Sequence, residues 1–235
     1  MPIAAIIPAA GVGTRMGGDR PKQFARLGGV PILIRTLRKF QASPLVDRMV
    51  VPLRSDEMDE LGRLLQAEAF KKPVEMVVGG DHRQESVASA LRGIDAKQFE
   101  WVVVHDAVRP FVDVRLIERV IQEARLNGAA ICAIPAMDTI KQIERQHVVA
   151  TLPRERIVLV QTPQAMRTGL LQRAFQKAEE ENFFGTDEAM LVEHLGEEVS
   201  VVLGSERNIK ITRPSDLPLA EFYLNMEMQE ATAQP

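Results

Sequence analysis

One stretch of the sequence indicates the fold: Ile3-Ala4-Ala5-Ile6-Ile7, followed by Pro8-Ala9-Ala10-Gly11-Val12-Gly13-Thr14-Arg15-Met16. The first five residues are apolar throughout, which is typical of a strand that is buried on both faces of a mostly parallel sheet. The small residues and glycines that follow allow backbone amides to approach an anion at the carboxyl end of that strand, where open α/β sheets bind ligands. We therefore expect an α/β fold with a ligand-binding edge that includes this loop.

The same alternation of strand and helix continues along the chain. Further apolar runs predict strands at 48–53, 74–78, 101–105 and 129–134, and segments of helical period lie at 32–40, 55–70, 83–92 and 114–127. Such an order predicts a Rossmann-like, mostly parallel sheet with helices on both faces.

The pattern changes after Pro135. Residues 138–143 and 147–152 flank Glu144-Arg145-Gln146 and predict a β-hairpin. A lone hairpin is marginally stable, so we expect it to lean on the domain or on another subunit, as a dimerisation arm. The rest of the chain predicts helices at 168–181, 186–194 and 214–226, strands at 199–203 and 209–212, and a frayed tail from Gln229.

Composition excludes several classes of function. Of the 235 residues, 46% are hydrophobic and 26% are charged, as in ordinary globular proteins. The formal net charge of -3 gives no global attraction to nucleic acid or to an anionic membrane, so we expect neither as a partner. With no basic leader before the first strand and no apolar run of membrane-spanning length, we expect a cytoplasmic location. The one cysteine, Cys132, lies in an apolar run and is interpreted as a buried strand thiol.

The first loop does not match the two familiar phosphate-binding motifs. A dinucleotide fingerprint needs a third glycine where Met16 stands, and the Walker motif needs a Gly-Lys-Ser/Thr that does not follow at the required spacing. What remains is a glycine-rich loop that carries Arg15 and is followed by Lys22, which suits a triphosphate. The alternative is that Gly11 and Gly13 only permit a turn and that the two cations are solvated surface charges.

A second polar group follows the strand at 101–105, in His105-Asp106-Ala107-Val108-Arg109. A carboxylate at this edge can hold Mg²⁺ or orient a polyol, and an arginine can bind a phosphate through two hydrogen bonds. Alternatively, Asp106 caps the next segment and pairs with Arg109. His105 is interpreted as a packed histidine at the end of the strand.

A third group is the turn Gly79-Gly80-Asp81, with Ser86 one turn into the following helix. Asp81 is a natural N-cap, and the same turn could hydrogen-bond a base or ribose. Six further residues carry little signal when each is taken alone: Thr139, Lys141, Arg154, Arg156, Thr162 and Lys210.

Taken together and in order, these segments resemble one family. The segments from Ala9 to Lys22, Gly79-Gly80-Asp81, 105–110, Asp138-Thr139, Thr162-Pro163-Gln164 and Asn208-Ile209-Lys210 are similar to those of the 2-C-methyl-D-erythritol 4-phosphate cytidylyltransferases. The resemblance covers nearly the whole chain. It implies a homodimeric, Mg²⁺-dependent enzyme of the non-mevalonate isoprenoid pathway, with one nucleotidyltransferase domain over 1–235 and a β-arm over 136–156.

The resemblance also implies roles for individual residues. Arg15, Lys22, Arg154 and Lys210 are expected to be catalytic, with Arg154 reaching in from the partner subunit. Expected to bind CTP are Ala9, Ala10, Gly11, Gly13, Gly80, Asp81 and Ser86. The small polyol phosphate is expected to contact Asp106, Ala107, Arg109, Thr139 and Thr162, and Asp106 is also the expected Mg²⁺ ligand.

Two departures from the family pattern and two alternatives remain. Val108 stands where relatives often have alanine, and Arg207 precedes Asn208 where an acidic residue is frequent. The acceptor could instead be ribitol 5-phosphate, or the chain could be a noncatalytic nucleotide-binding regulator, although Arg15 and Lys22 favour an enzyme. Because the chain ends soon after its last predicted helix, we expect a single activity.

Overall fold

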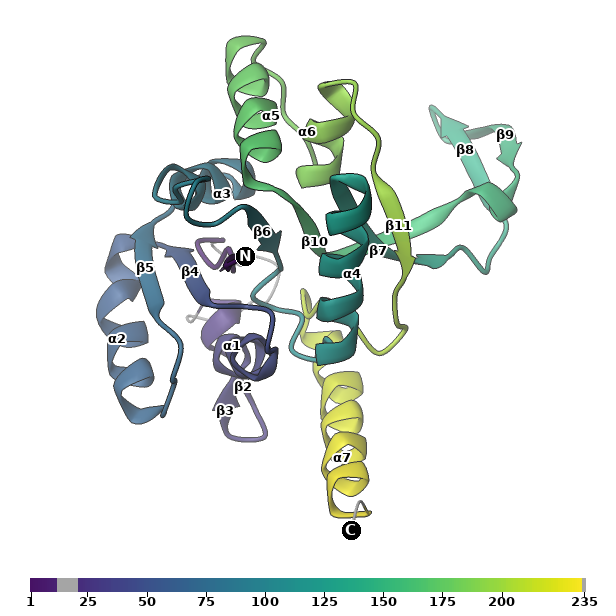
Figure 1. Cartoon of the computed structure of the whole chain (residues 1–235). Helices are drawn as coiled ribbons and strands as arrows, with labels where there is room; N and C mark the ends of the chain where they lie inside the picture. The colour runs from purple at the N-terminus through teal and green to yellow at the C-terminus, as the bar shows by residue number, and fades with distance from the viewer. Residues whose placement is uncertain (12–20, 234–235) are drawn as a thin grey trace.

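The computed structural model describes residues 1–11 and 21–233, and its central element is a seven-stranded sheet in the order β11-β7-β10-β6-β1-β4-β5 (Figure 1). The strands are β1 (Ile3–Ile6), β4 (Arg48–Leu53), β5 (Val74–Val78), β6 (Trp101–Val104), β7 (Ala129–Pro135), β10 (Val158–Arg167) and β11 (Ser200–Leu203). Pairing is parallel except at β10, which runs antiparallel to both β6 and β7. The predicted mostly parallel α/β sheet is confirmed.

Helices cover both faces of the sheet. One face packs against α1 (Ile32–Ala42), α2 (Met58–Ala67) and α4 (Val114–Asn127), and the other packs against α3 (Arg83–Arg92), α5 (Thr168–Glu180) and α6 (Glu188–His194). Successive side chains of β1 point to opposite faces of the sheet. Ile3 and Ala5 therefore pack in the hydrophobic cluster on the first face, and Ala4 and Ile6 pack in the cluster on the second. This two-sided burial explains why the strand is apolar throughout.

A third, smaller cluster lies beside α7 (Leu217–Ala233), which ends at the yellow terminus in Figure 1. Leu224 of α7 packs there with Leu27 of β2 (Arg26–Leu27), with Ile32 and with Val108. β2 pairs with β3 (Val30–Pro31). Short 3₁₀ turns lie at η2 (Lys22–Phe24), η3 (Ser55–Glu57), η4 (Arg154–Arg156) and η5 (Pro214–Asp216).

The predicted hairpin is present and protrudes from the sheet. β8 (Ile140–Glu144) pairs antiparallel with β9 (His147–Leu152), and Figure 1 shows both strands projecting away from the remaining elements. Apolar side chains on this hairpin face solvent, with Ile143 66% and Val148 60% exposed. We call residues 136–156 the arm.

Several details differ from the sequence-based predictions. Strand β10 was not predicted, because Gln161, Thr162 and Pro163 interrupt its apolar pattern; the structure accommodates them at an irregularity in the pairing with β7, where the Thr162–Pro163 peptide is cis. The predicted strand at 209–212 is wrong. Ile211 is buried under α7 and donates its backbone N–H to the Val108 carbonyl at 2.9 Å, without a neighbouring strand to extend the ladder.

Three further predictions also differ from the structure. The α7 helix continues to Ala233, so the tail is helical over 229–233 rather than frayed. The N-cap of α3 is His82 rather than Asp81, and its backbone N–H donates to the Glu85 carboxylate at 3.0 Å. The segment predicted as one helix over 55–70 divides into η3 and α2.

Candidate active site

The carboxyl ends of the parallel strands β1, β4, β5 and β6 meet at one edge of the sheet, and a pocket lies there. Many of the residues singled out from the sequence line it together: Ala9, Ala10, Gly11, Lys22, Gly80, Asp81, Ser86, Asp106, Ala107 and Lys210. Such an edge is where open α/β sheets bind ligands. The predictions at Gly13 and Arg15 fall outside the described residues.

The turn after β5 forms one wall of this pocket through a close backbone approach. A Cβ atom on Gly79 would lie 2.6 Å from the Ala10 Cβ, so a side chain at this position would push the turn away from the first loop. The hydroxyl of the buried Ser86 lies 3.2 Å from the Gly80 backbone N–H, which donates to it. Ser86 therefore holds the turn in shape while it lines the pocket.

Lys22 lines the pocket from the turn η2, and a buried contact holds this turn in place. The neighbouring Gln23 is buried and donates its side-chain N–H to Glu57 at 3.1 Å. Burial raises the pKa of the Glu57 carboxyl above its ordinary value, against the opposing effect of its hydrogen bonds. This buried pair anchors the turn that carries Lys22.

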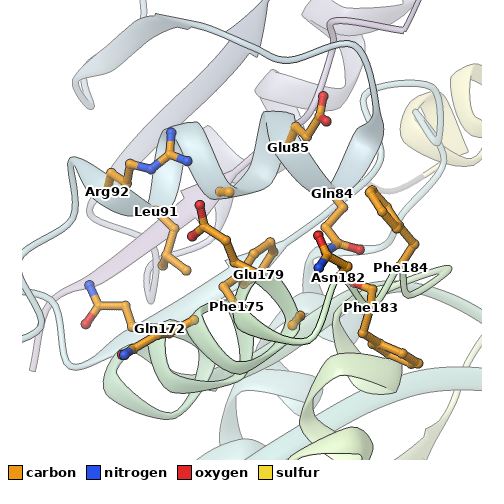
Figure 2. A pocket seen from close by; sticks show the side chains of 13 residues that line it. Gln84, Glu85, Leu91, Arg92, Gln172, Phe175, Glu179, Asn182, Phe183 and Phe184 are labelled. Atoms are coloured by element: carbon orange, nitrogen blue, oxygen red, sulfur yellow. Dashed lines mark hydrogen bonds between the residues drawn. The ribbon is translucent and has the colours of Figure 1, made fainter.

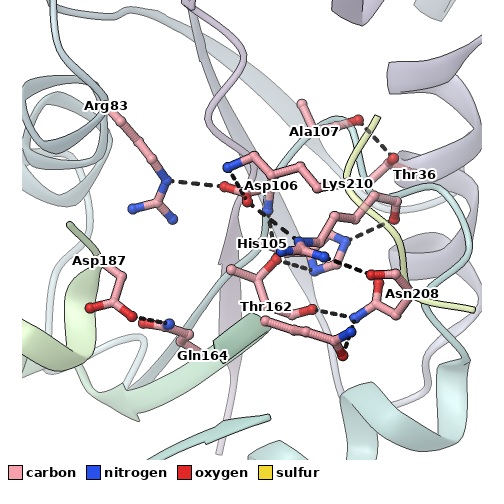
Figure 3. A network of polar contacts seen from close by, with 12 residues as sticks. Thr36, Arg83, His105, Asp106, Ala107, Thr162, Gln164, Asp187, Asn208 and Lys210 are labelled. Carbon is pink, nitrogen blue, oxygen red and sulfur yellow. Dashed lines mark hydrogen bonds and ion pairs between the residues drawn. The ribbon is translucent and has the colours of Figure 1, made fainter. Parts of the chain in front are cut away.

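The centre of the site is Asp106, a carboxylate surrounded by three cations (Figure 3). Its Oδ1 accepts from Arg83 Nε at 3.0 Å, and its Oδ2 lies 2.8 Å from Lys210 Nζ and 3.5 Å from Arg109 Nε. Burial alone would raise the Asp106 pKa, but the charges of Arg83, Lys210 and Arg109 together hold it well below its ordinary range. Asp106 is therefore ionised at neutral pH. The sequence-based alternative, in which Asp106 pairs with Arg109 alone, accounts for only one of these three cations.

Arg83 is the main residue that the sequence reasoning missed. Besides Asp106 it binds Glu188 through two hydrogen bonds, Nη1 to Oε1 at 2.8 Å and Nη2 to Oε2 at 2.9 Å. Glu188 is 1% exposed and comes from α6, 105 positions along the chain. A helix that begins with an arginine carries no local signal for a partner so distant, so only the fold could identify this contact.

The predicted packing of His105 and Cys132 is confirmed. His105 is fully buried, with both ring nitrogens in hydrogen bonds, and burial lowers its pKa to about 4. Cys132 is fully buried in β7, and the same effect raises the pKa of its thiol to about 12. The Cys132 thiol is therefore not in the thiolate form that a nucleophile requires, and both nitrogens of His105 are already used in hydrogen bonds within the fold.

A second pocket adjoins the first, and Lys210 lines both. It is lined by Arg109, Ile134, Leu159, Val160, Gln161, Ile209, Lys210, Asp216 and Leu219. Thr162, another predicted contact, is only 4% exposed, and its hydroxyl accepts from the Asp106 backbone N–H at 3.1 Å. Lys210 thus brings positive charge to both pockets, and Arg109 brings it to the second pocket.

Two predicted residues lie on the arm and outside both pockets of the described chain. Thr139 precedes β8 and is exposed, and Arg154 follows β9, where its guanidinium donates to the Met137 carbonyl at 2.8 Å. Neither residue lines either of the two pockets, and Figure 1 shows the hairpin of the arm projecting away from the sheet.

A larger groove lies elsewhere, between α3 and α5. It measures about 400 Å³ and is bordered by Leu91, Phe175, Phe183 and Phe184, with Glu85 and Glu179 at its rim (Figure 2). None of the residues predicted from the sequence lines it. Its charged lining residues are Glu85, Glu179 and Arg92, which do not form a group of cations like the one near Asp106, so the edge near Asp106 remains the candidate site.

Metal ligands are sparse in the described part of the chain. Over residues 1–11 and 21–233, no group of three or more His, Cys, Asp or Glu side chains is placed to hold a metal ion. The same described residues include no helix long and apolar enough to cross a membrane.

Known proteins match this chain over almost its full length. The family model described as 2-C-methyl-D-erythritol 4-phosphate cytidylyltransferase matches residues 3–226. The protein of that name from Acidobacterium capsulatum is 48% identical over 233 residues, covering 95% of this chain and 98% of the relative. A relative with the same name from Geobacter metallireducens is 44% identical and is covered to 100% of its length, against 97% of this chain.

A solved structure matches as well. The 4-diphosphocytidyl-2C-methyl-D-erythritol synthase from Anaerococcus prevotii superposes with a TM-score of 0.85 at 33% identity, covering 95% of this chain and 98% of the other. The sheet edge, the charged pocket and the arm described above thus occur in a chain that matches these proteins in both sequence and fold. This chain belongs to the 2-C-methyl-D-erythritol 4-phosphate cytidylyltransferase family.

Proposed function

We propose that this protein transfers the cytidylyl group of CTP to 2-C-methyl-D-erythritol 4-phosphate, giving 4-diphosphocytidyl-2-C-methyl-D-erythritol and pyrophosphate, as a cytoplasmic enzyme of the non-mevalonate isoprenoid pathway. The observation that carries the proposal is the placement of Asp106, Arg109 and Lys210 between two adjoining pockets. One pocket is bounded by the glycine turn and the first loop and takes the nucleotide. The other takes the polyol phosphate.

The nucleophile is an oxygen of the acceptor's own phosphate. A phosphate monoester has a second pKa of about 6 and is therefore largely dianionic at neutral pH, so no general base is needed. This oxygen forms a bond to the α-phosphorus of CTP while the bond from that phosphorus to the bridging oxygen of pyrophosphate breaks. The electron pair leaves with pyrophosphate, and atoms and charge balance without an oxidant or a further reactant.

The main obstacle to this reaction is the approach of one anion to another. Positioning and positive charge lower that barrier. Lys22 lies on the nucleotide side, Arg109 on the acceptor side and Lys210 on both. Asp106 holds Arg109 and Lys210 at fixed positions, so that little rearrangement is needed as the transition state forms. Arg15, Ala9, Ala10, Gly11 and Gly13 remain proposed contacts of the triphosphate.

Mg²⁺ is proposed as a companion of CTP. Asp81 and Asp106 both line the nucleotide pocket, and each Asp106 oxygen already lies within ion-pair distance of a cation, so the described residues do not form a metal site from protein ligands alone. Mg²⁺ commonly binds through one or two carboxylates together with substrate phosphates and water, which suits this arrangement. When bound, the ion would neutralise charge on the triphosphate. Asp106 is the carboxylate that could contact it.

We also propose a homodimer, with residues 1–235 as one catalytic domain and 136–156 as its dimerisation arm. The exposed Ile143, Val148 and Val149 of the arm supply an apolar contact surface, and Thr139 and Arg154 on the same arm could complete the partner's acceptor pocket. Analytical ultracentrifugation tests this assembly. A monomer at micromolar concentration would contradict it.

The activity is tested by incubating the protein with CTP, Mg²⁺ and one acceptor at a time while pyrophosphate release is measured. We expect turnover with 2-C-methyl-D-erythritol 4-phosphate and little with ribitol 5-phosphate. Turnover with ribitol 5-phosphate alone would replace the acceptor. Silence with both acceptors would contradict the enzyme and favour a nucleotide-binding regulator, which CTP binding by calorimetry would then reveal. Replacing CTP by UTP measures the preference for the base.

A further inference from the structure

Behind the charged residues of the site, four residues form a closed ring of hydrogen bonds, which we call the polar ring: His105, Arg109, Asn208 and Thr162 (Figure 3). His105 Nε2 lies 3.0 Å from the Arg109 carbonyl, and the Arg109 Nη1 lies 2.6 Å from the Asn208 carbonyl. Asn208 Nδ2 lies 2.8 Å from the Thr162 carbonyl, and the Thr162 hydroxyl lies 3.0 Å from His105 Nδ1.

The direction of each bond in the polar ring follows from its partners. A carbonyl can only accept, so His105 Nε2 carries the proton that is donated to Arg109. In the neutral imidazole Nδ1 is then an acceptor, and the Thr162 hydroxyl donates to it. This leaves the Thr162 oxygen free to accept from the Asp106 backbone N–H at 3.1 Å. The ring therefore requires one tautomer of His105.

The amide of Asn208 is also oriented by its surroundings. Its Nδ2 faces two acceptors, the Thr162 carbonyl and Gln161 Oε1, so the nitrogen and not the oxygen must point toward β10. His105 and Asn208 are fully buried, and Thr162 is 4% exposed. Water therefore cannot readily replace any of these bonds, and loss of one partner leaves a buried polar group unsatisfied.

The polar ring joins three segments that are remote in sequence. The segment after β6 carries Asp106 and Arg109, the irregular middle of β10 carries Thr162, and the segment after β11 carries Asn208, two residues before Lys210. Arg109 thus belongs to the polar ring. Asp106 directly follows His105, and Lys210 lies two residues after Asn208. The segment that carries Lys210 is not part of the sheet, so its placement depends on such contacts.

We propose that His105 is a positioning residue for cytidylyl transfer, which acts through Thr162 and Asn208 to fix Asp106, Arg109 and Lys210 in one arrangement. This inference rests on the proposed function. His105 touches neither substrate, and its effect is on the geometry of the acceptor side. A shift of the order of 1 Å in a group that orients a reactant can lower a rate by about 100-fold, so the ring should matter for turnover beyond its contribution to folding.

The test compares matched substitutions at Thr162, in the middle of β10, and at Thr168, the first residue of α5. Thr162→Val removes the hydroxyl from the ring, and Thr162→Ser retains it. Thr168→Val is the control, because Thr168 is also buried and donates its hydroxyl to the Phe99 carbonyl at 2.6 Å, at the end of the sheet remote from the pockets. Each variant is assayed for kcat and for the KM of both substrates, with circular dichroism and thermal melts to confirm folding.

We expect Thr162→Val to lower kcat/KM for the acceptor by about 100-fold, while the KM for CTP changes by less than about threefold. Thr162→Ser should recover most of this loss, and Thr168→Val should lose thermal stability with kcat and both KM values unchanged. If Thr162→Val melts lower but retains the wild-type kinetic constants, as its control does, the ring is only structural and the inference is overturned.

A second pair of variants divides the roles of the two ring nitrogens. His105→Gln places a donor near the position of Nε2 and removes the acceptor for Thr162, whereas His105→Asn does the reverse. If the ring acts as a unit, adding Thr162→Val to His105→Gln should cause little further loss, less than about threefold. Multiplicative losses would contradict a single unit.

Nitrogen NMR of the folded protein gives a reading that is independent of activity. With the imidazole labelled, His105 should show a proton bound to Nε2 and none bound to Nδ1 at neutral pH. A proton on Nδ1 would overturn the ring as drawn. A silent wild-type enzyme would instead refute the proposed function and, with it, the role in catalysis, whereas an active wild type with an unaffected Thr162→Val would refute the inference alone.

Discussion

The edge of the sheet around Asp106 and the arm over 136–156 are built in opposite ways. At the edge, the buried charge of Asp106 is paired within the chain by Arg83, Arg109 and Lys210. On the arm, apolar side chains such as Ile143 and Val148 face solvent. The edge is therefore organised before any ligand arrives, whereas the arm has a surface that only a further partner could bury.

This contrast predicts different responses to mutation. A change at the edge should alter the chemistry directly and should not depend on protein concentration. A change on the arm should act through association and should be relieved at high protein concentration. The following experiments sharpen or break that distinction, beginning with the largest expected effect.

Asp106→Asn should have the largest effect. Loss of the carboxylate leaves three neighbouring cations without their shared counterion, so we expect kcat/KM to fall on the order of 1,000-fold and the free energy of unfolding to fall by about 3 kcal/mol. Steady-state kinetics and urea unfolding measure the two effects. Asp113→Asn is the control, since Asp113 is an exposed N-cap of α4 and asparagine caps as well. An Asp106→Asn enzyme with a tenth of the normal activity would contradict the proposed organisation.

Lys22→Ala should separate rate from binding. Because Lys22 is proposed to stabilise charge that develops at the α-phosphorus, we expect the rate of the chemical step to fall by about 100-fold while CTP affinity falls by less than about tenfold. Rapid-quench kinetics and calorimetry measure the two quantities, with the exposed Lys97→Ala as a control of equal charge change. Equal losses in both would refute the role.

Val149→Asp tests the arm. Charge on this exposed apolar residue should weaken the proposed dimer and lower activity by about tenfold at nanomolar enzyme, with recovery as the concentration rises. Gln146→Asp adds the same charge at the hairpin turn, and both its association and its activity should stay normal. Sedimentation and activity measured over the same range of concentrations provide the comparison. An activity loss that does not depend on enzyme concentration would contradict a role of the arm in dimerisation.

The sequence predicted the turns at the edge of the sheet better than the contacts between distant elements there, for a physical reason. Glycine turns and strand ends leave local signals, so Ala9, Gly80 and Asp106 could be placed at one edge from periodicity alone. Arg83 and Glu188 form their contact between α3 and α6, which no local pattern records. Strand β10 was missed because the polar residues and proline near Thr162 that disguise it as a loop are the same residues that the site requires.

The pH dependence should reflect the substrate rather than Asp106. Since neighbouring cations hold the Asp106 pKa well below its ordinary value, its stabilising contribution is present above about pH 4 and is lost only as the pH falls further. The acid limb of kcat/KM should instead lie near pH 6, at the second ionisation of the acceptor phosphate. A phosphonate analogue, which ionises at higher pH, should move this limb upward. If the acid limb of kcat/KM does not move with the phosphonate, the ionisation belongs to a group of the protein and not to the acceptor.

Cys132 should have the smallest effect. Burial raises its thiol pKa to about 12, so at pH 8 the folded protein should react with iodoacetamide at least about 100-fold more slowly than the urea-unfolded protein, without losing activity. Mass spectrometry of the two samples measures the difference. Equal labelling, or inactivation on labelling, would contradict the assignment of Cys132 to the core.

The most direct test of cytidylyl transfer follows the acceptor's phosphate oxygens. If 2-C-methyl-D-erythritol 4-phosphate carries a heavy oxygen isotope in its non-bridging phosphate positions, attack by this phosphate on the α-phosphorus of CTP places a labelled oxygen between the two phosphorus atoms of the product. Phosphorus NMR should then show isotope shifts at both phosphorus atoms and unlabelled pyrophosphate. Label in pyrophosphate, or a product whose cytidylyl phosphorus shows no shift, would contradict the proposed reaction.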